Sequence, residues 1–237
     1  MKNKPIIALD FANRQEVETF LNHFDKEEQL FVKVGMELYY QEGPSIITFL
    51  KEAGHEIFLD LKLHDIPNTV ESAMRGLAKL GVDMVNIHAA GGKNMMEAAI
   101  KGLKDGTPEG KQVPLIIAVT QLTSITEEAM HTEQLIPVTL EESVLNYAKT
   151  AQASGINGVV CSPMEAQKVK EATSDEFIRV TPGIRLATGD VNDQKRVMTP
   201  ALARANGSSY IVVGRPITRS VDPKQAYREI YREWNGE

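Results

Sequence analysis

The chain has 237 residues, of which 42% are hydrophobic, and a formal net charge of −6 at pH 7. This length suits a single α/β barrel, for which roughly 250 residues is typical. The acidic balance argues against a nucleic-acid-binding groove, which needs clustered Lys and Arg, and no stretch reaches the about 18 apolar residues of a membrane span.

Short β-branched runs alternate with longer segments of helical period, and eight such pairs follow one another along the chain. The expected strands are residues 6–11, 31–36, 56–63, 84–89, 115–121, 158–162, 178–181 and 210–213. The expected helices are residues 14–24, 44–53, 70–80, 94–103, 140–153, 164–171, 199–206 and 223–234. Glycines such as Gly54, Gly81 and Gly155 precede strands where a helix can end in the left-handed conformation. We therefore predict a closed (β/α)8 TIM barrel, formed by one catalytic domain over residues 1–237.

The third expected strand carries the strongest chemical signal. Its end, Asp60-Leu61-Lys62-Leu63-His64-Asp65, contains two carboxylates and one ammonium group. Side chains alternate faces in an extended strand, so Asp60 and Lys62 are predicted to point the same way. Two charges on a face built for burial need partners, because desolvating an unpaired ion is costly. A structural ion pair is the alternative explanation of this pattern.

Neighbouring strands supply partners for this pair. Asp10 falls at the inward-facing period of the first strand, and Lys33 at that of the second. Because residues at the carboxyl ends of barrel strands converge on the mouth, we expect Asp10, Lys33, Asp60 and Lys62 to form one charge-balanced network, which Asp65 extends. Lysines flanked by carboxylates stay protonated, which makes Lys62 a proton donor and weakens a Schiff-base mechanism. A purely structural network at the rim remains the alternative.

Two histidines also fall near this rim. His64 and His88 are isolated, and single histidines of a barrel are more often hydrogen-bonded core residues than catalysts. No His-x-x-x-His or Cys-x-x-Cys spacing points to a metal centre. The sequence therefore predicts neither a metal nor another cofactor.

Two long loops, residues 123–137 and 185–195, are expected on the carboxyl-terminal face, where long loops commonly act as lids.

Between them lies the single cysteine, Cys161, which excludes an internal disulfide and fits a reducing compartment. A packing thiol at a strand end is favoured over a nucleophile. The apolar stretch near the start of the chain is interrupted at Asp10, too early for a signal peptide, so we expect a cytoplasmic protein.

The last strand ends in Val213-Gly214-Arg215-Pro216-Ile217, and the seventh in Val180-Thr181-Pro182-Gly183-Ile184-Arg185. Barrels often bind phosphate between the loops that follow these two strands. Gly214 permits close approach of the backbone, and Arg215 offers a bidentate fork. We expect a phosphate site here, with an ordinary surface turn as the alternative.

These residues together closely resemble the orotidine 5′-phosphate decarboxylase family in its bacterial form, over essentially the whole chain. The resemblance rests on the run from Asp60 to Thr69, on Lys33 in Phe-Val-Lys-Val-Gly, and on the two segments after strands seven and eight. It implies that Lys62 is the catalytic acid, that Lys33, Asp60 and Asp65 complete the charged array, and that a homodimer shares Asp65 across its interface.

The resemblance also implies how a substrate is held. Asp10 and Lys33 would bind ribose hydroxyls, Thr123 the pyrimidine, and Gln194, Gly214 and Arg215 the phosphate, with Arg185 closing over the ligand. The substrate-binding residues that it implies are Asp10, Lys33, Asp60, Ile66, Thr69, Thr123, Pro182, Arg185, Gln194, Gly214 and Arg215.

The implied reaction is decarboxylation of orotidine 5′-phosphate to UMP in pyrimidine synthesis, with Lys62 stabilising and protonating a C6 carbanion without metal or cofactor. Two alternatives stay open. One is a Mg2+-dependent sugar-phosphate decarboxylase or aldolase of the 3-keto-gulonate or hexulose phosphate type, which shares an Asp-x-Lys-x-x-Asp strand. The other is a nucleotide sensor without turnover. The His-Asp-Ile-Pro-Asn-Thr continuation favours the nucleotide enzyme over the first alternative.

Overall fold

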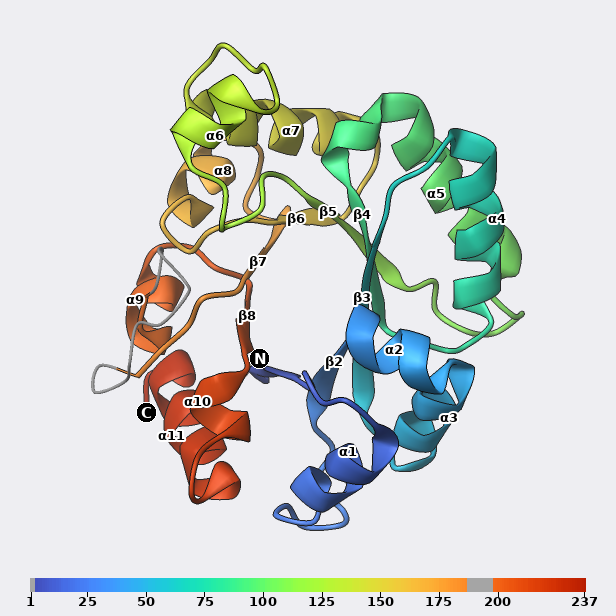
Figure 1. Cartoon of the computed structure of the whole chain (residues 1–237), viewed down its shortest axis with the longest axis vertical. Helices are drawn as coiled ribbons and strands as arrows, with labels where there is room; N and C mark the ends of the chain where they lie inside the picture. Colours follow the sequence, from blue (N-terminus) through green and yellow to red (C-terminus); the bar gives the residue numbers. More distant parts are fainter. Residues whose placement is uncertain (1–2, 187–197) are drawn as a thin grey trace.

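The computed structural model describes residues 3–186 and 198–237, and eight parallel strands close into one barrel (Figure 1). The strands pair in chain order, and β8 returns to pair with β1. They are β1 (Ile6–Ala8), β2 (Phe31–Gly35), β3 (Glu56–Leu63), β4 (Met84–His88), β5 (Leu115–Val119), β6 (Gly158–Val160), β7 (Ile178–Thr181) and β8 (Tyr210–Val213). The predicted (β/α)8 TIM barrel is confirmed.

Helices surround this barrel on its outside (Figure 1). They are α1 (Arg14–Leu21), α2 (Met36–Glu42), α3 (Pro44–Glu52), α4 (Pro67–Ala78), η1 (Ala89–Gly91), α5 (Gly92–Gly106), α6 (Glu127–Thr132), α7 (Leu140–Ala153), α8 (Ala166–Ala172), α9 (Pro200–Ala205), α10 (Arg215–Thr218) and α11 (Pro223–Asn235). Gly54, Gly81 and Gly155 have φ angles of 82°, 71° and 83°, which confirms the predicted left-handed turns. Within the described residues no helix combines the length and the apolar character needed to cross a membrane.

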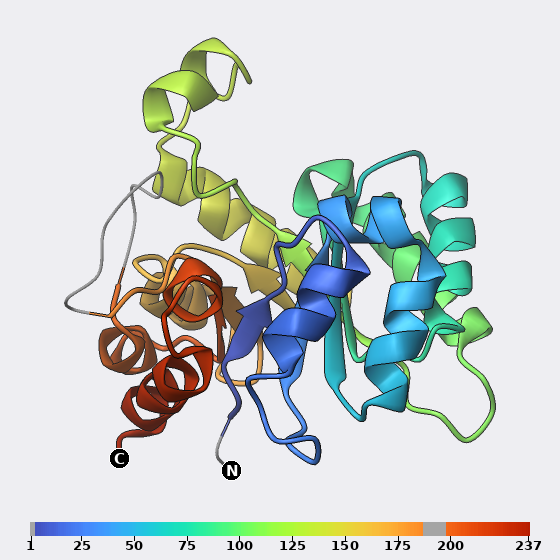
Figure 2. The same ribbon diagram turned by 60° about the horizontal axis from the view of Figure 1, so that its bottom comes forward.

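The predicted bounds err mainly at the mouth of the barrel. The strands predicted at 6–11, 31–36, 84–89, 115–121 and 158–162 all end earlier in the structure, at residues 8, 35, 88, 119 and 160. The prediction of a loop over residues 123–137 is wrong in part. Helix α6 lies inside it, and the Thr126 side chain caps this helix by accepting a hydrogen bond from the Ala129 amide. Figure 2 shows α6, in yellow-green, standing away from the barrel.

Alternation along the strands creates two hydrophobic layers. One layer fills the barrel interior and comprises Ile6, Ala8, Phe31, Phe58, Met84, Ile117, Val180 and Val212. The other lies between the strands and the helices, where Ile7 and Leu9 point outward from the first strand region. Cys161 belongs to this outer layer and is fully buried. Burial raises the pKa of its thiol, which suits the packing role predicted for it.

Helices α4 and α5 approach closely because two glycines face the neighbouring backbone. A Cβ atom added at Gly102 would lie 2.1 Å from the carbonyl oxygen of Glu71, and one at Gly106 would lie 2.2 Å from that of Arg75. Glycine at both positions therefore lets the two helices pack backbone against backbone beside β3 and β4.

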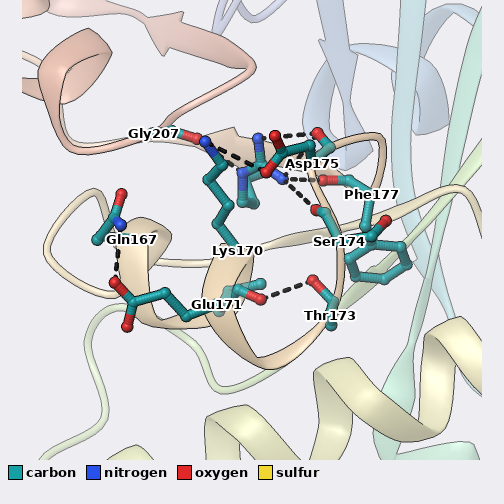
Figure 3. A network of polar contacts seen from close by, with 10 residues as sticks. Gln167, Lys170, Glu171, Thr173, Ser174, Asp175, Phe177 and Gly207 are labelled. Carbon is teal, nitrogen blue, oxygen red and sulfur yellow. Dashed lines mark hydrogen bonds and ion pairs between the residues drawn. The ribbon is translucent and has the colours of Figure 1, made fainter.

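The start of β7 is held by a buried guanidinium group. Arg179, which is 5% exposed, donates hydrogen bonds to the carbonyl oxygens of Gly207 at 2.7 Å, Ser174 at 3.1 Å and Phe177. Figure 3 shows these carbonyl groups gathered around the turn after α8, where Lys170 also pairs with Asp175. This network orders the amino-terminal end of the barrel, whereas the charged residues considered next lie at the carboxyl ends of the strands.

Candidate active site

An irregular stretch of β3 brings Asp60 and Lys62 together. The register between β3 and β4 shifts between Leu59 and Leu63, and inside this bulge Lys62 has a φ angle of 52°. This left-handed conformation costs roughly 1–3 kcal/mol in a residue that carries a side chain. The predicted regular alternation is wrong at this point, but its consequence holds, since Lys62 Nζ lies 2.6 Å from Asp60 Oδ1.

The charged side chains form a continuous series of ion pairs. Lys33 Nζ lies 3.1 Å from Asp10 Oδ1 and 3.3 Å from Asp60 Oδ2. The side chains of Lys33 and Asp60 are 11% and 12% exposed, whereas that of Asp10 is 64% exposed. The structure thus brings together Asp10, Lys33, Asp60 and Lys62, which the sequence had grouped, in a network that is dry at its centre and open at one end.

Burial and ion pairing act in opposite directions on the two central groups. Burial, the largest influence, raises the pKa of Asp60, but Lys33 and Lys62 together with the hydrogen bond from Asn86 hold that pKa below its usual value. For Lys33, burial lowers the pKa most strongly, yet attraction to Asp60 and Asp10 leaves it above its usual value. Both groups are therefore charged at neutral pH.

Asn86 is a member of this site that the sequence did not single out. It lies on β4, is 1% exposed, and donates from Nδ2 to Asp60 Oδ1 at 2.6 Å. Its Oδ1 accepts a hydrogen bond from the Lys62 amide at 2.8 Å. The available signal was its inward-facing position between Met84 and His88, which places a polar amide in the barrel interior.

Lys62 is among the residues that line a cavity of about 140 Å³. Most of its wall is apolar, and its polar residues are Lys33, Asp60 and Lys62 together with Gln121 and Thr123. The lining residues are Lys33, Phe58, Asp60, Lys62, Val119, Gln121, Leu122, Thr123, Val160, Val180, Pro182 and Val212. A cavity of this size and polarity fits one flat heteroaromatic ring.

A second cavity of about 290 Å³ adjoins the first, since Lys33, Pro182 and Val212 line both. It is lined by Ala8, Asp10, Lys33, Pro182, Gly183, Arg185, Val212, Gly214, Arg215, Thr218 and Arg219. The arginines come from the segments after β7 and β8, as predicted for a phosphate site, although Arg219 was not foreseen. The two cavities form one slot whose chemistry changes from apolar beside Lys62 to cationic beside Arg215.

Other predicted residues lie outside this slot within the single chain. Asp65, Ile66 and Thr69 are exposed, and Asp65 Oδ1 accepts a hydrogen bond from the Ile66 amide at 2.6 Å. Ile66 is 66% exposed, which is unusual for an aliphatic side chain next to a site. Gln194 lies outside the described residues. The chain alone therefore does not bring Asp65 to Lys62.

The two histidines do not enter the ion-pair network. The rings of His64 and His88 have their centroids 5.4 Å apart, and His64 is exposed. Burial, followed by the neighbouring His64 and Lys62, lowers the pKa of His88, which is therefore neutral at neutral pH. In the described part of the chain no three His, Cys, Asp or Glu side chains are arranged to hold a metal ion.

The chain is similar to known proteins in both sequence and structure. A profile described as "Orotidine 5'-phosphate decarboxylase / HUMPS family" matches residues 3–230. A protein of Bacillus cereus (strain AH187) named orotidine 5′-phosphate decarboxylase is 62% identical over 236 residues, which cover 100% of this chain and 99% of the relative. The crystal structure of orotidine 5′-phosphate decarboxylase from Lactobacillus acidophilus is 46% identical, with a TM-score of 0.89 over 98% of this chain and 100% of that one. An uncharacterized conserved protein from Geobacillus kaustophilus is 55% identical, with a TM-score of 0.88 over 97% of this chain and 99% of that one.

Proposed function

The chain belongs to the orotidine 5′-phosphate decarboxylase / HUMPS family, and from this premise we propose that it is the carboxy-lyase that converts orotidine 5′-phosphate to UMP and CO2 in pyrimidine synthesis. The single observation that carries the proposal is the ammonium group of Lys62, which is paired with Asp60 at the wall of a cavity sized for one ring. The proposed catalytic unit is a single barrel domain.

The slot matches the three parts of this substrate. The pyrimidine occupies the smaller cavity, next to Thr123 and Pro182. The ribose hydroxyls lie between Asp10 and Lys33. Lys33 lines both cavities, and Asp10 lines the second one. The phosphate is bound in the second cavity by Gly214 and Arg215, a bidentate donor suited to phosphate oxygens. In this proposal Arg185 and the segment that contains Gln194 close over the ligand.

The chemical difficulty lies at C6 of the pyrimidine. When the bond from C6 to the carboxylate breaks, the electron pair stays on C6 in an orbital that does not overlap the ring π-system. A positive charge fixed in the ring plane stabilises that pair as it forms, and such preorganised electrostatics commonly provide the largest catalytic effect. Lys62 supplies the charge and then transfers one ammonium proton to C6, which yields UMP. Solvent returns a proton to the neutral amine.

Asp60 and Lys33 prepare Lys62 for this role. Asp60 is ionised and lies against both ammonium groups, so it orients the Lys62 ammonium group and balances its charge until the carbanion develops. The same carboxylate lies next to the leaving carboxylate of the substrate, and repulsion between the two adds to the drive for CO2 release. Because Lys62 supplies the stabilising charge, the proposed reaction requires neither a metal ion nor another cofactor.

We include a homodimer in this proposal, with Asp65 of each subunit completing the charged array of the other. Support comes from the exposed run His64 to Thr69, which follows β3 directly and presents Ile66 to solvent in the single chain. Ile66 and Thr69 would then line the partner's site. A cytoplasmic location is part of the same proposal, because the one thiol of the chain is buried and unpaired in the core.

The direct test incubates the purified protein with orotidine 5′-phosphate and follows the loss of orotate absorbance in the presence of a chelator. We expect undiminished turnover after exhaustive chelation. A parallel sample with 3-keto-gulonate 6-phosphate and added Mg2+ tests the rival enzyme class. Turnover of the sugar phosphate without turnover of orotidine 5′-phosphate would exclude the proposed activity. Loss of orotidine 5′-phosphate turnover on chelation, with recovery on adding Mg2+, would exclude the metal-independent mechanism.

A further inference from the structure

Asn86 makes both of its side-chain hydrogen bonds to the two residues that the proposed reaction depends on most. The first bond comes from the backbone amide of Lys62 at 2.8 Å, and the second goes to the carboxylate of Asp60 at 2.6 Å. Only one orientation of the amide satisfies both, because a carboxylate requires a donor and a backbone N–H requires an acceptor. The side chain is thus fixed in rotation as well as in place.

The first bond stabilises an unusual backbone. At the bulge of β3 the register shifts between Leu59 and Leu63, so the Lys62 amide has no ladder partner on β4. Asn86 Oδ1 takes the place of a ladder carbonyl, while Lys62 holds a φ angle of 52°. An unsatisfied N–H in this half-buried position would favour a return to extended backbone. Such a return would turn the Lys62 side chain away from its present direction.

The second bond fixes the carboxylate. Asp60 Oδ1 accepts hydrogen bonds from Asn86 Nδ2 and Lys62 Nζ, both at 2.6 Å, while Oδ2 faces Lys33 Nζ at 3.3 Å. Without Asn86, the carboxylate can rotate about its Cβ–Cγ bond and follow either lysine. Asn86 is neutral, so it orients Asp60 without altering the charge balance of the network.

We infer that Asn86 is a positioning residue. Its side-chain oxygen holds the Lys62 backbone and thereby sets the direction of the Lys62 ammonium group, and its side-chain nitrogen sets the direction of the Asp60 carboxylate. This inference rests on the proposed function for its kinetic consequence. The positioning role itself is supported by the two hydrogen bonds, the bulge in β3 and the near-complete burial of Asn86. Asn86 touches neither C6 nor the phosphate in this account, and acts only through its two neighbours.

The test compares Asn86→Ala and Asn86→Asp with a matched control, Asn157→Ala. Asn157 Oδ1 also accepts a hydrogen bond from a strand amide, that of Ile116 at 2.8 Å, but its side chain bonds to no member of the ion-pair network in the described part of the chain. Asn86→Asp keeps an acceptor for the Lys62 amide and replaces the donor to Asp60 with a second carboxylate. The readouts are kcat, KM and the Kd for UMP.

A misplacement of about 1 Å at the reacting group lowers turnover on the order of 100-fold, so we expect kcat of Asn86→Ala to fall by about that factor. Both KM and the Kd for UMP should stay within roughly threefold of wild type, because binding contacts lie elsewhere. Asn86→Asp should also lose kcat, and Asn157→Ala should lose none. A kcat of Asn86→Ala within threefold of wild type, or a parallel loss of UMP affinity, would overturn the inference.

A crystal structure of Asn86→Ala provides a second readout that is independent of turnover. Lys62 should leave the positive φ region, or its Nζ should move beyond hydrogen-bond distance of Asp60. An unchanged Lys62 backbone and ammonium position would overturn the inference. If the alanine variant does not fold, Asn86→Ser carries the same readouts. A wild-type protein that fails to turn over orotidine 5′-phosphate would remove the proposed function, while the structure of the variant would still decide the positioning role.

Discussion

The ammonium group of Lys62 lies 2.6 Å from the carboxylate of Asp60 on the same strand, at a point where Lys62 leaves the extended conformation. The pair is therefore set by the backbone of β3 and does not depend on a loop. Lys33 on β2 joins from the neighbouring strand, 3.3 Å from the other oxygen of Asp60. Groups proposed to act on C6 thus lie on the rigid barrel, and those proposed to bind phosphate lie on the segments after β7 and β8.

Asp60→Asn should make the free energy of unfolding less dependent on pH in mild acid. The pKa of Asp60 in the folded state lies below its usual value, so its contribution to stability is present above pH about 4 and is lost as the pH falls through the folded pKa. At pH 7 the substitution should cost about 3 kcal/mol, because it leaves Lys62 without its carboxylate and the buried Lys33 with only the exposed Asp10 as a partner. Urea unfolding between pH 7 and pH 3 measures this difference in unfolding free energy, which should narrow as the pH falls below about 4.

A surface carboxylate serves as the control for this prediction. Asp25, whose side chain is 63% exposed, pairs with Lys224. Asp25→Asn should change the unfolding free energy little across the same pH range, because exposed ion pairs contribute little. If the difference in unfolding free energy between wild type and Asp60→Asn stays constant or widens toward low pH, Asp60 is not a buried, ionised carboxylate.

Arg215→Ala should act on binding more than on chemistry. Loss of a bidentate phosphate contact should raise KM by about 10- to 100-fold, with a smaller effect on kcat at saturating substrate. Orotidine, which lacks the phosphate, provides the matched control, because wild type and variant should use it equally poorly. Steady-state kinetics with both substrates decides the point. An unchanged KM with a reduced kcat, or an equal loss on orotidine, would count against a phosphate contact.

The proposed sharing of Asp65 can be tested by mixing two inactive proteins. In a mixed dimer of Lys62→Ala and Asp65→Ala subunits, one site combines an intact Lys62 with an intact Asp65 from the other subunit. Random exchange of subunits should therefore restore roughly a quarter of wild-type sites. Activity is measured after the two variants are mixed and re-equilibrated. No recovery, with subunit exchange verified by mass, would show that each site uses its own Asp65.

Gly102→Ala should destabilise the barrel, because its new Cβ would lie 2.1 Å from the Glu71 carbonyl oxygen in the facing helix. We expect a loss of about 1–3 kcal/mol in the free energy of unfolding, as for other overpacked contacts. Gly76→Ala in α4 is the matched control, because an added Cβ there meets nothing within 4 Å. That control should gain up to about 1 kcal/mol from helix propensity. Equal effects of the two substitutions in urea denaturation would refute the close helix contact.

Much of this architecture follows from local sequence patterns. Eight βα units predict the barrel, and the alternation of Ile6, Ala8 and Asp10 places the first acid at the mouth. The left-handed φ of Lys62 could not be predicted, since it depends on a bulge between β3 and β4 and on a partner 24 residues later in the chain. The same long-range dependence hid Asn86, which has no motif of its own.

Other features lay beyond sequence reasoning for different reasons. The second strand is predicted one residue too long because its last expected residue, Met36, is apolar yet begins α2. Helix α6 has only six residues and lies within a predicted loop, and the signal for it is Thr126 as N-cap followed by two acidic residues in the first turn, Glu127 and Glu128. The proposed role of Asp65 depends on a second subunit, and neither the sequence pattern nor one chain fixes how two chains meet.

The central claim is that the Lys62 ammonium group performs the chemical step. Its most direct test is the turnover of Lys62→Ala at saturating orotidine 5′-phosphate with chelator present, together with the Kd for UMP, which reports on an intact slot. We predict that kcat falls by at least about 1,000-fold, as for loss of a main electrostatic or proton-donating group, while UMP still binds within about tenfold of wild type. Near-native turnover by this variant would contradict the claim.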